Sequence, residues 1–500
     1  MSGQPTRWRR AGGVLLHPTS LPGPFGAGDL GPEADQWVSW LARAGCRLWQ
    51  ILPLGPVGAD ASPYLSSSAF AGNPWLISPE KLAEDGLLSE DDLAPFRGNA
   101  TDQADFDQAR HVRRSLLALA TQHFGDRANQ QLREQAETFF ESSAPWLDDF
   151  ALFQVIQAVH DGSPWHAWPP ALANRDGRAL QAFEEAHSQE IEAEKIQQFF
   201  FERQWAQVRE LAQREGIAII GDIPIFVALD SADVWAHREL FKLEPDGLPT
   251  VVAGVPPDYF SATGQRWGNP LYNWDEMASR GFTWWIERLR RLMTQVDRVR
   301  VDHFRGFESA WEIPASHPTA EHGRWSAGPG ESIFQAAEAS LGKLPIIAED
   351  LGLITPEVEA LRDRLGFPGM RVLQFGFNGG PDHPYLPHRY PTQCVAYTGT
   401  HDNDTSLGWY EAAPQAEKEA CRRYLRSNGA QIAWDLTRAV WGSPANTAIV
   451  PMQDLLELGS AARMNTPGTT EGNWAWRVLK SQLSDQLAKR VKDLNLAYER

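Results

Sequence analysis

The stretch IAIIGDIPIFV, residues 217–227, is the clearest indication of the fold. Its apolar residues form a nearly continuous run, which is typical of a parallel strand buried on both faces. Seven further short apolar segments occur along the chain, at 13–19, 47–54, 298–304, 346–350, 370–377, 394–399 and 447–452. Helical patterns lie between several of them. The sequence therefore predicts an α/β protein in which eight βα units close into a (β/α)8 TIM barrel.

The uneven spacing of these strands predicts two insertions that form subdomains around the C-terminal face of the barrel. Residues 61–216, between the second and third strands, are mainly helical because apolar residues recur there at helical spacing. Residues 228–282, after the third strand, are rich in Gly, Pro and Trp, and an aperiodic segment of that length is usually functional. We expect one catalytic barrel over residues 1–500, with an active-site loop at 254–270 inside the second insertion.

Composition and charge exclude several classes of protein. The 46 basic and 64 acidic residues give a net charge of −18, which disfavours binding to nucleic acid or to an anionic membrane surface. The chain has no apolar run near 18 residues, so we expect no membrane span. The three scattered cysteines fit a reducing compartment, and the N-terminal segment is too short in apolar residues for a signal peptide. These features predict a cytoplasmic protein.

Acidic residues and histidines follow the ends of the predicted strands, where a barrel of this kind builds its active site. They are Asp222 after the third strand, Asp302 and His303 after the fourth, Glu349 and Asp350 after the fifth, and His401, Asp402 and Asp404 after the seventh. Residues i and i+2 of a strand share a side, so Arg300 should lower the pKa of Asp302 and keep this carboxylate ionised. Glu349 follows an apolar run and faces other carboxylates, so its pKa should be raised. One ionised and one protonated carboxyl group are the equipment for breaking a glycosidic bond.

Other interpretations of these residues compete with catalysis. A single acidic residue at a strand end often caps a helix or pairs with an arginine. His401, Asp402 and Asp404 are of metal-ligand types, but they lack the spacing of a calcium loop or of a zinc enzyme. No glycine-rich phosphate-binding string follows a strand. We therefore expect neither a metal ion nor a cofactor.

Long strings along the chain carry a resemblance to a known family. They include LLHPTSLPGPFGAGDLG, SPYLSSSAFAGNP, IIGDIPIFVALDSADVWAH, VAGVPPDYFSATGQRWGNPLY, RVDHFRGFESAWEIP, IIAEDLGLITPEV and TGTHDNDTSLGWY. In this respect the sequence resembles the amylomaltases, 4-α-glucanotransferases of the α-amylase superfamily that are also called disproportionating enzymes. The resemblance implies that Asp302 is the nucleophile, Glu349 the acid/base and Asp402 a third carboxylate that binds and distorts the sugar. It also implies substrate-binding roles for Tyr64, Asp222, Trp267, Arg300, His303 and His401.

The implied reaction is transfer of an α-1,4-glucan segment to the 4-hydroxyl of another glucan, or to the donor's own far end to give a cyclic glucan. The partners would be α-1,4-glucans and maltooligosaccharides. Hydrolysis by the same carboxylates, a silent glucan-binding protein and a barrel enzyme for phosphorylated sugars are the alternatives. The chain also departs from the family at Ala59, where many members carry an aromatic residue, and at Phe106, which stands in place of a family tyrosine. This departure predicts that a remote second glucan site of some members is weak or absent here.

Overall fold

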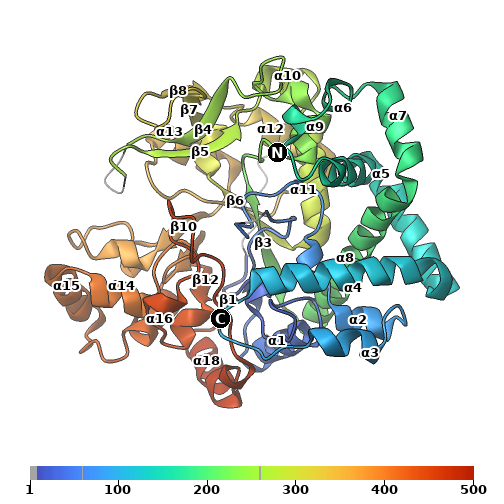
Figure 1. The fold of residues 1–500 in the computed structure, drawn as a ribbon. Helices are drawn as coiled ribbons and strands as arrows, with labels where there is room; N and C mark the ends of the chain where they lie inside the picture. The colour runs from blue at the N-terminus through green and yellow to red at the C-terminus, as the bar shows by residue number, and fades with distance from the viewer. Residues whose placement is uncertain (1–7, 59, 258–260) are drawn as a thin grey trace.

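The computed structural model describes residues 8–58, 60–257 and 261–500. All eight predicted barrel strands are present and are parallel to their neighbours (Figure 1). They are β1 (Ala11–Leu15), β2 (Leu48–Gln50), β3 (Ala218–Pro224), β6 (Arg298–Asp302), β9 (Ile346–Ala348), β10 (Gly369–Val372), β11 (Cys394–Tyr397) and β12 (Thr447–Pro451). The predicted α/β barrel is therefore confirmed.

Neighbours in the barrel follow the order of the chain, and β12 returns to pair with β1 from Ala11–Thr447 to Leu15–Pro451. Between β9 and β10, the Ala348 N–H donates a hydrogen bond of 2.9 Å to the Pro368 carbonyl, so the circle is nearly closed. The strands bury both faces. One apolar cluster, which includes Leu15, Ile220, Ile347, Met370 and Ile449, brings together residues from strands all around the barrel. A second and larger cluster joins strands to the surrounding helices. Burial on both sides explains why the strands read as continuous apolar runs.

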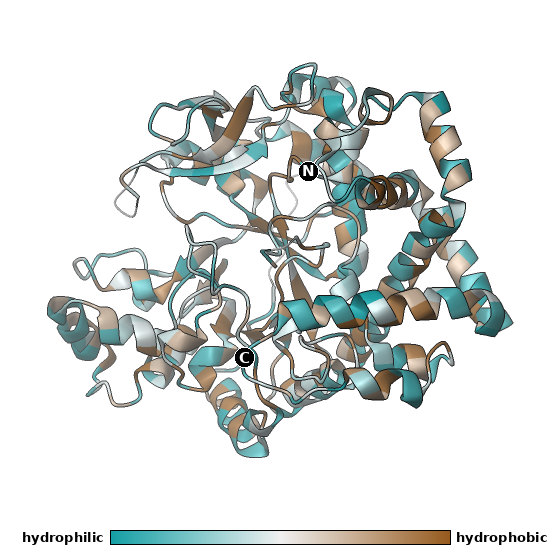
Figure 2. Ribbon diagram, viewed as in Figure 1, coloured by the Kyte–Doolittle hydropathy of each residue, from teal (hydrophilic) through white to brown (hydrophobic). Residues whose placement is uncertain are grey.

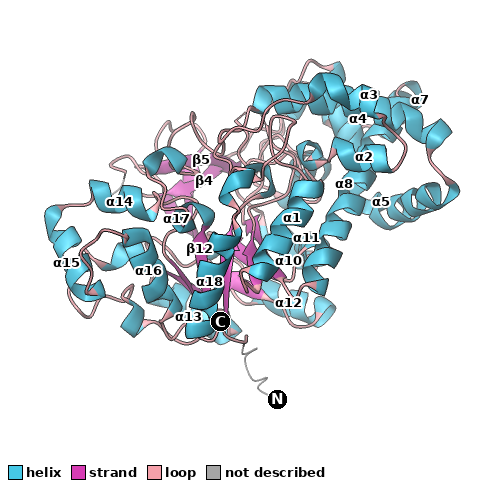
Figure 3. Cartoon of the chain, turned by 90° about the horizontal axis from the view of Figure 1, so that it is seen from below, coloured by secondary structure: helices cyan, strands magenta, loops and turns pink. Residues whose placement is uncertain are grey.

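Helices cover the barrel on its outside. Four of the covering helices are α1 (Pro32–Arg43), α11 (Thr283–Gln295), α12 (Ser332–Leu341) and α18 (Asp485–Ala497), which Figure 3 shows from below. The other covering helices include α14 (Ser406–Ala412), α15 (Gln415–Leu425) and α16 (Ile432–Trp441), at the lower left of Figure 1, and α13 (Pro356–Leu365), at its upper left. In Figure 2 the central strands are largely brown, whereas the helices around them mix teal and brown, as expected for amphipathic helices on a core.

The segment predicted to be a helical insertion contains α2 (Pro79–Glu84), α3 (Glu90–Leu93), α4 (Phe106–Arg127), α5 (Gln130–Val159), α6 (Pro170–Ala173), α7 (Gly177–Ala186) and α8 (Ser188–Arg214). The long helices α5 and α8 pack on one another. The same α8 also contacts α1, α11 and β3, so its last turns belong to the layer around the barrel. That 61–216 and 228–282 are separate subdomains stays a prediction.

A second sheet, which the sequence analysis missed, lies beside the mouth of the barrel (Figure 1). It is antiparallel, with the order β5-β4-β7-β8. The strands β4 (Val251–Val255) and β5 (Gln265–Pro270) come from the predicted loop 254–270 and its approach, so this segment is largely a hairpin. The strands β7 (Ser309–Pro314) and β8 (Arg324–Ala327) follow β6. The sheet therefore ties the segment after β3 to the segment after β6.

The search for membrane-spanning helices gave a negative result. In the part of the chain that the structure describes, no helix combines the length and the apolar character needed to cross a bilayer.

Candidate active site

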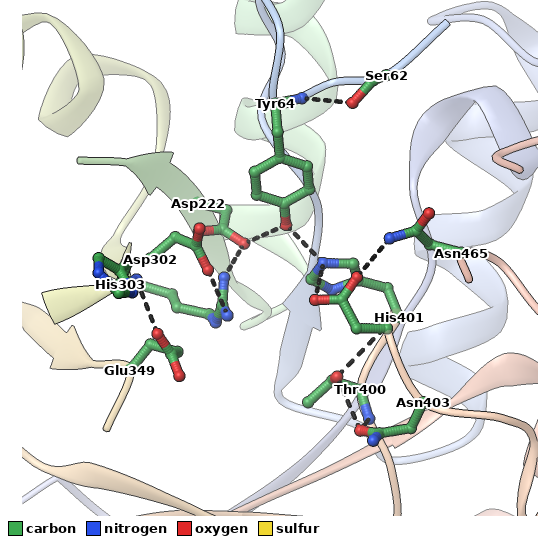
Figure 4. A network of polar contacts seen from close by, with 12 residues as sticks. Ser62, Tyr64, Asp222, Asp302, His303, Glu349, Thr400, His401, Asn403 and Asn465 are labelled. Atoms are coloured by element: carbon green, nitrogen blue, oxygen red, sulfur yellow. Dashed lines mark hydrogen bonds and ion pairs between the residues drawn. The ribbon is translucent and has the colours of Figure 1, made fainter. Parts of the chain in front are cut away.

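A cavity of about 670 Å³ opens at the carboxyl ends of the barrel strands. Eight of the nine predicted site residues line it: Tyr64, Trp267, Arg300, Asp302, His303, Glu349, His401 and Asp402. The ninth, Asp222, is buried on β3 and is hydrogen-bonded to two of the others. The structure thus brings all nine residues together from segments that lie far apart in the sequence. Figure 4 labels six of them: Tyr64, Asp222, Asp302, His303, Glu349 and His401.

Arg300 joins two of the carboxylates. Its Nη1 lies 2.6 Å from Oδ2 of Asp222, and its Nη2 lies 2.8 Å from Oδ1 of Asp302. The Arg300 and Asp222 side chains are almost fully buried, whereas Asp302 exposes 29% of its side chain. One charge-assisted hydrogen bond therefore fixes Oδ1 of Asp302 and leaves the carboxylate facing the cavity.

The expected lowering of the Asp302 pKa is wrong. Burial raises the pKa of Asp302 to about 6, because the favourable charge of Arg300 does not offset desolvation and the nearby charges of Asp222 and Asp402. Arg300 shares its charge between Asp222 and Asp302, which the i, i+2 spacing alone does not reveal. Neutral pH is still about one unit above the pKa of Asp302, so this carboxylate is ionised in most molecules.

The expected raising of the Glu349 pKa is confirmed. Burial, followed by repulsion from Asp302, raises the pKa of Glu349 to about 8. Two backbone N–H groups hold its carboxyl group: His303 donates to Oε2 at 2.7 Å and Leu351 donates to Oε1 at 2.8 Å. His303 has a left-handed backbone (φ 53°), a conformation that is uncommon for a residue with a side chain. The left-handed backbone of His303 is therefore part of the geometry that orients Glu349.

Tyr64 and His401 form a stacked pair, with ring centroids 5.2 Å apart and planes 13° from parallel. The Tyr64 hydroxyl lies 2.8 Å from Asp222 Oδ2 and 2.8 Å from His401 Nε2. Since an ionised carboxylate only accepts, the hydroxyl donates to Asp222, and His401 must carry its proton on Nε2 to donate to Tyr64. Burial lowers the pKa of His401, which fits this neutral form. The same Nε2 lies 3.4 Å from Oδ2 of Asp402.

Asp402 is held by residues that the sequence analysis did not identify. The Asn465 amide donates to Oδ1 of Asp402 at 2.6 Å, and Arg463 donates to its backbone carbonyl at 2.6 Å. The Asp402 N–H donates to the Thr400 hydroxyl at 3.3 Å. An available signal was the aperiodic segment 465–474, because a loop that contains Pro and two Gly residues is often functional.

Trp267 and His303 meet edge to face at the other side of the cavity, with ring centroids 4.8 Å apart. Trp267 donates from Nε1 to Gln265 on the same strand at 3.1 Å. Burial lowers the pKa of His303 to about 3, so its imidazole is neutral. The β4–β5 hairpin thus forms one wall of the cavity and contacts the residue that orients Glu349.

Two of the acidic residues found at strand ends serve the fold instead. Asp350 accepts from the Met370 N–H at 2.6 Å and pairs with Arg362 and Arg371. Asp404 accepts from the Thr405 N–H and from the Ser460 hydroxyl, each at 2.7 Å. Both carboxylates are absent from the lining of the cavity, as far as the structure describes the chain.

The predicted weakness of a second glucan site rests on Ala59 and Phe106. Ala59 lies outside the described residues. Phe106 packs against Trp75 at a centroid distance of 6.0 Å. The prediction about this remote site therefore stays a prediction.

Comparison with known proteins gives a consistent result. A family model described as 4-alpha-glucanotransferase matches residues 16–482. The chain is 50% identical to a 4-alpha-glucanotransferase of Thermus thermophilus over 98% of this chain and 99% of that protein. It is 46% identical to a chloroplastic/amyloplastic 4-alpha-glucanotransferase of Arabidopsis thaliana over 98% of this chain and 86% of that one.

Among solved structures, an amylomaltase of Streptococcus agalactiae in complex with acarbose superposes with a TM-score of 0.95. Its sequence is 38% identical, and the match covers 98% of this chain and all of that one. An amylomaltase of Corynebacterium glutamicum, 20% identical, shares the fold with a TM-score of 0.78 over 98% of this chain and 74% of that one. The extent of the family match and the identities over nearly the whole length show that the chain belongs to the 4-alpha-glucanotransferase family.

Proposed function

We propose that this chain is a retaining 4-α-glucanotransferase that acts on α-1,4-glucans and maltooligosaccharides. The observation that supports it best is the pair formed by Asp302 and Glu349. Their pKa values of about 6 and about 8 leave an ionised nucleophile and a protonated acid in one cavity at neutral pH. Family membership supplies the substrate class.

The first half-reaction is attack by a carboxylate oxygen of Asp302 on the anomeric carbon of a glucose unit. The bond from that carbon to the glycosidic oxygen breaks, and Glu349 gives its proton to the departing 4-oxygen. A covalent glucosyl ester on Asp302 remains. In the second half-reaction Glu349 takes the proton of an acceptor 4-hydroxyl, whose oxygen attacks the same carbon and releases Asp302. Two inversions give net retention, and the side chains supply all the chemistry.

The neighbouring residues support these steps. Arg300 balances the charge of Asp302 and Asp222, and Asp402, held by Asn465, would bind the hydroxyls of the sugar at the scissile bond. The stacked rings of Tyr64 and His401 offer a platform for that sugar. When the acceptor is the far end of the same glucan, the product is cyclic.

Hydrolysis is the competing outcome of the same first step. Water at about 55 M exceeds a millimolar sugar by roughly four to five powers of ten, on the order of 6 kcal/mol. A glucan acceptor offsets this difference when its 4-hydroxyl is held in position and several of its rings are bound. The β4–β5 hairpin, which carries Trp267, lies where it can contribute such contacts.

Incubation with pure maltotriose, followed by separation of the products, tests the proposal. Transfer gives glucose together with oligosaccharides longer than maltotriose, whereas hydrolysis gives shorter sugars only. The Asp302→Asn chain is the control for contaminating activity. A product mixture without longer sugars would overturn the assignment as a transferase.

The three cysteines, Cys46, Cys394 and Cys421, are buried and free. Free thiols are typical of proteins kept in a reducing compartment, which supports a cytoplasmic location.

A further inference from the structure

A second large cavity lies outside the barrel, between the long helix α5 and the barrel helix α11. Its volume of about 680 Å³ is close to that of the active-site cavity. The short helices α9 (Ala232–Ala236) and α10 (Trp274–Ser279) complete its wall. We call it the α5–α11 cavity. Its described lining and that of the active-site cavity have no residue in common.

Aromatic rings make up much of the apolar lining of the α5–α11 cavity. Trp146 on α5 is half-buried and stacks on Phe70, with ring centroids 6.4 Å apart and planes 15° from parallel. Phe139 meets the edge of Trp146, and Trp284 meets the edge of Phe70. The rings of Phe139, Phe70 and Trp284 are nearly buried, whereas Trp146 is half-buried and has the Arg291 guanidinium 5.2 Å from its ring centroid. A ligand that stacks on Trp146 would therefore also contact Arg291.

The charged groups of the same cavity are already paired with one another or with nearby residues. Arg290 pairs with Glu287 at 3.1 Å, Arg291 with Glu202 at 2.7 Å, and Arg280 lies 2.8 Å from Glu239. A charged ligand would have to compete with these pairs. A neutral ligand with hydroxyl groups can instead add hydrogen bonds to guanidinium and carboxylate groups that keep their partners.

We propose that the α5–α11 cavity is a second binding site for maltooligosaccharides, with a glucose ring stacked on Trp146. An apolar ring face with a rim of paired charges fits a neutral sugar, whose faces carry C–H groups and whose edges carry hydroxyls. The choice of ligand rests on the proposed function, since it is the glucan that the enzyme handles. This site is distinct from the remote site considered for Ala59 and Phe106, because the cavity is lined by other residues.

A short segment connects the cavity to the active site. Ser68 and Phe70 line the cavity, and Tyr64 lines the active site a few residues earlier. The segment is anchored to the helix beside the cavity, because the Ala69 N–H donates to Asp233 at 2.7 Å. A glucan in the cavity therefore rests on the same stretch of chain that presents Tyr64.

The test uses the Asp302→Asn chain, which should not turn the glucan over. Its migration is measured in native gels with and without amylose, and crystals are soaked with maltoheptaose. Trp146→Ala removes the stacking ring, and Ser142→Trp fills the cavity from an exposed lining position. Trp325→Ala is the matched control, because Trp325 is 40% exposed and lies outside both cavities.

We expect Trp146→Ala and Ser142→Trp each to weaken retardation by amylose by about two- to tenfold, while Trp325→Ala leaves it unchanged. The crystals should show a sugar ring on Trp146. Unchanged retardation in both cavity variants overturns the proposal, and a sugar in the crystal would then be binding at crystal concentration only. A separate measurement, transfer activity on maltotriose, tests the proposed function. In the chain that carries only Trp146→Ala, transfer from maltotriose should persist, and its absence in the unsubstituted chain would refute the transferase assignment instead.

Discussion

Arg300 shows how one buried side chain sets the charges of an active site. It binds Asp222 and Asp302 at once, and both carboxylates therefore depend on a single positive charge. Asp302→Asn keeps a hydrogen-bonding group near Arg300 but removes the anionic oxygen needed for attack. We predict a loss of turnover of about four powers of ten or more, with the fold unchanged by circular dichroism. A variant that kept more than about a hundredth of the rate would show that Asp302 is not the nucleophile.

The pKa values of the same two carboxyl groups predict a bell-shaped pH dependence of kcat/KM. As the pH falls through about 6, Asp302 takes up a proton and can no longer attack. As the pH rises through about 8, Glu349 loses the proton that it must donate. Activity should therefore be highest between these values. Initial rates of glucose release from maltotriose between pH 4 and pH 10, with enzyme stability checked at each pH, measure the profile; a rate that stays constant up to pH 10 would contradict the acid role of Glu349.

At the scale of single residues, the sequence predicts which side chains lie together better than it predicts their pKa values. The strand ends and the family strings bring all nine site residues into one place, and the structure agrees. The prediction that the pKa of Asp302 is lowered was wrong. The spacing of Arg300 and Asp302 does not show that Asp222, on another strand, shares the same guanidinium. Asn465 was missed because the aperiodic segment 465–474 indicates a functional loop but does not show which of its side chains contacts Asp402.

The β4–β5 hairpin is the element most directly placed to influence the choice between transfer and hydrolysis. Gly264 (φ +68°) allows the hairpin to turn back, since a Cβ there would lie 2.4 Å from the Val255 carbonyl oxygen. Trp267 on β5 faces the cavity and touches the His303 ring. Residues 258–260, between β4 and β5, lie outside the described residues.

We predict that Trp267→Ala raises the ratio of hydrolysis to transfer more than it lowers donor cleavage. Loss of a stacking ring should weaken acceptor binding by about two- to tenfold, while water needs no such platform. Reducing ends and glucose released from maltotriose are measured in parallel for both proteins. Trp325→Ala on β8 of the same sheet is the control. An unchanged ratio with uniformly slower cleavage would exclude an acceptor platform at Trp267.

The sequence predicted the barrel strands but not the strands β7 and β8, and the difference has a physical reason. The barrel strands are buried on both faces and read as apolar runs, so all eight were found. In β7 buried and half-exposed residues are mixed, and β8 is largely exposed, so neither carries such a run. β8 pairs only with β7, and the pairing of β7 with β4 joins segments that follow different barrel strands, which no local pattern records.

At the scale of the whole molecule, the two ends of the described chain meet where the barrel closes. β12 pairs with β1, and Arg10 beside β1 donates to the carbonyls of Trp441 and Tyr498. Arg500 is only 7% exposed and donates to the same Trp441 carbonyl and to the carbonyl of Ala11, among others. These arginines tie the first strand, the helix before β12 and the last helix together.

Arg500 therefore tests how much the closing contacts contribute to stability. Removal of its guanidinium in Arg500→Ala takes one donor from each of several buried carbonyl groups, although Arg10 still donates to some of them. A hydrogen bond that involves a charged group contributes about 1.5–3 kcal/mol. Relaxation and entry of water would reduce the sum, so we expect a loss of about 2–5 kcal/mol in the free energy of unfolding. In a chain of 500 residues the unfolding entropy is large, and the melting temperature should fall by about 2–5 °C at a fixed scan rate. Arg490→Ala is the matched control, because Arg490 is 41% exposed and its contact with Glu457 is 3.6 Å long.

Since Arg500 lies outside the active-site cavity, kcat/KM for maltotriose should stay unchanged at 25 °C. Equal melting temperatures for Arg500→Ala and Arg490→Ala would mean that strand pairing between β12 and β1 closes the barrel without help from the arginines.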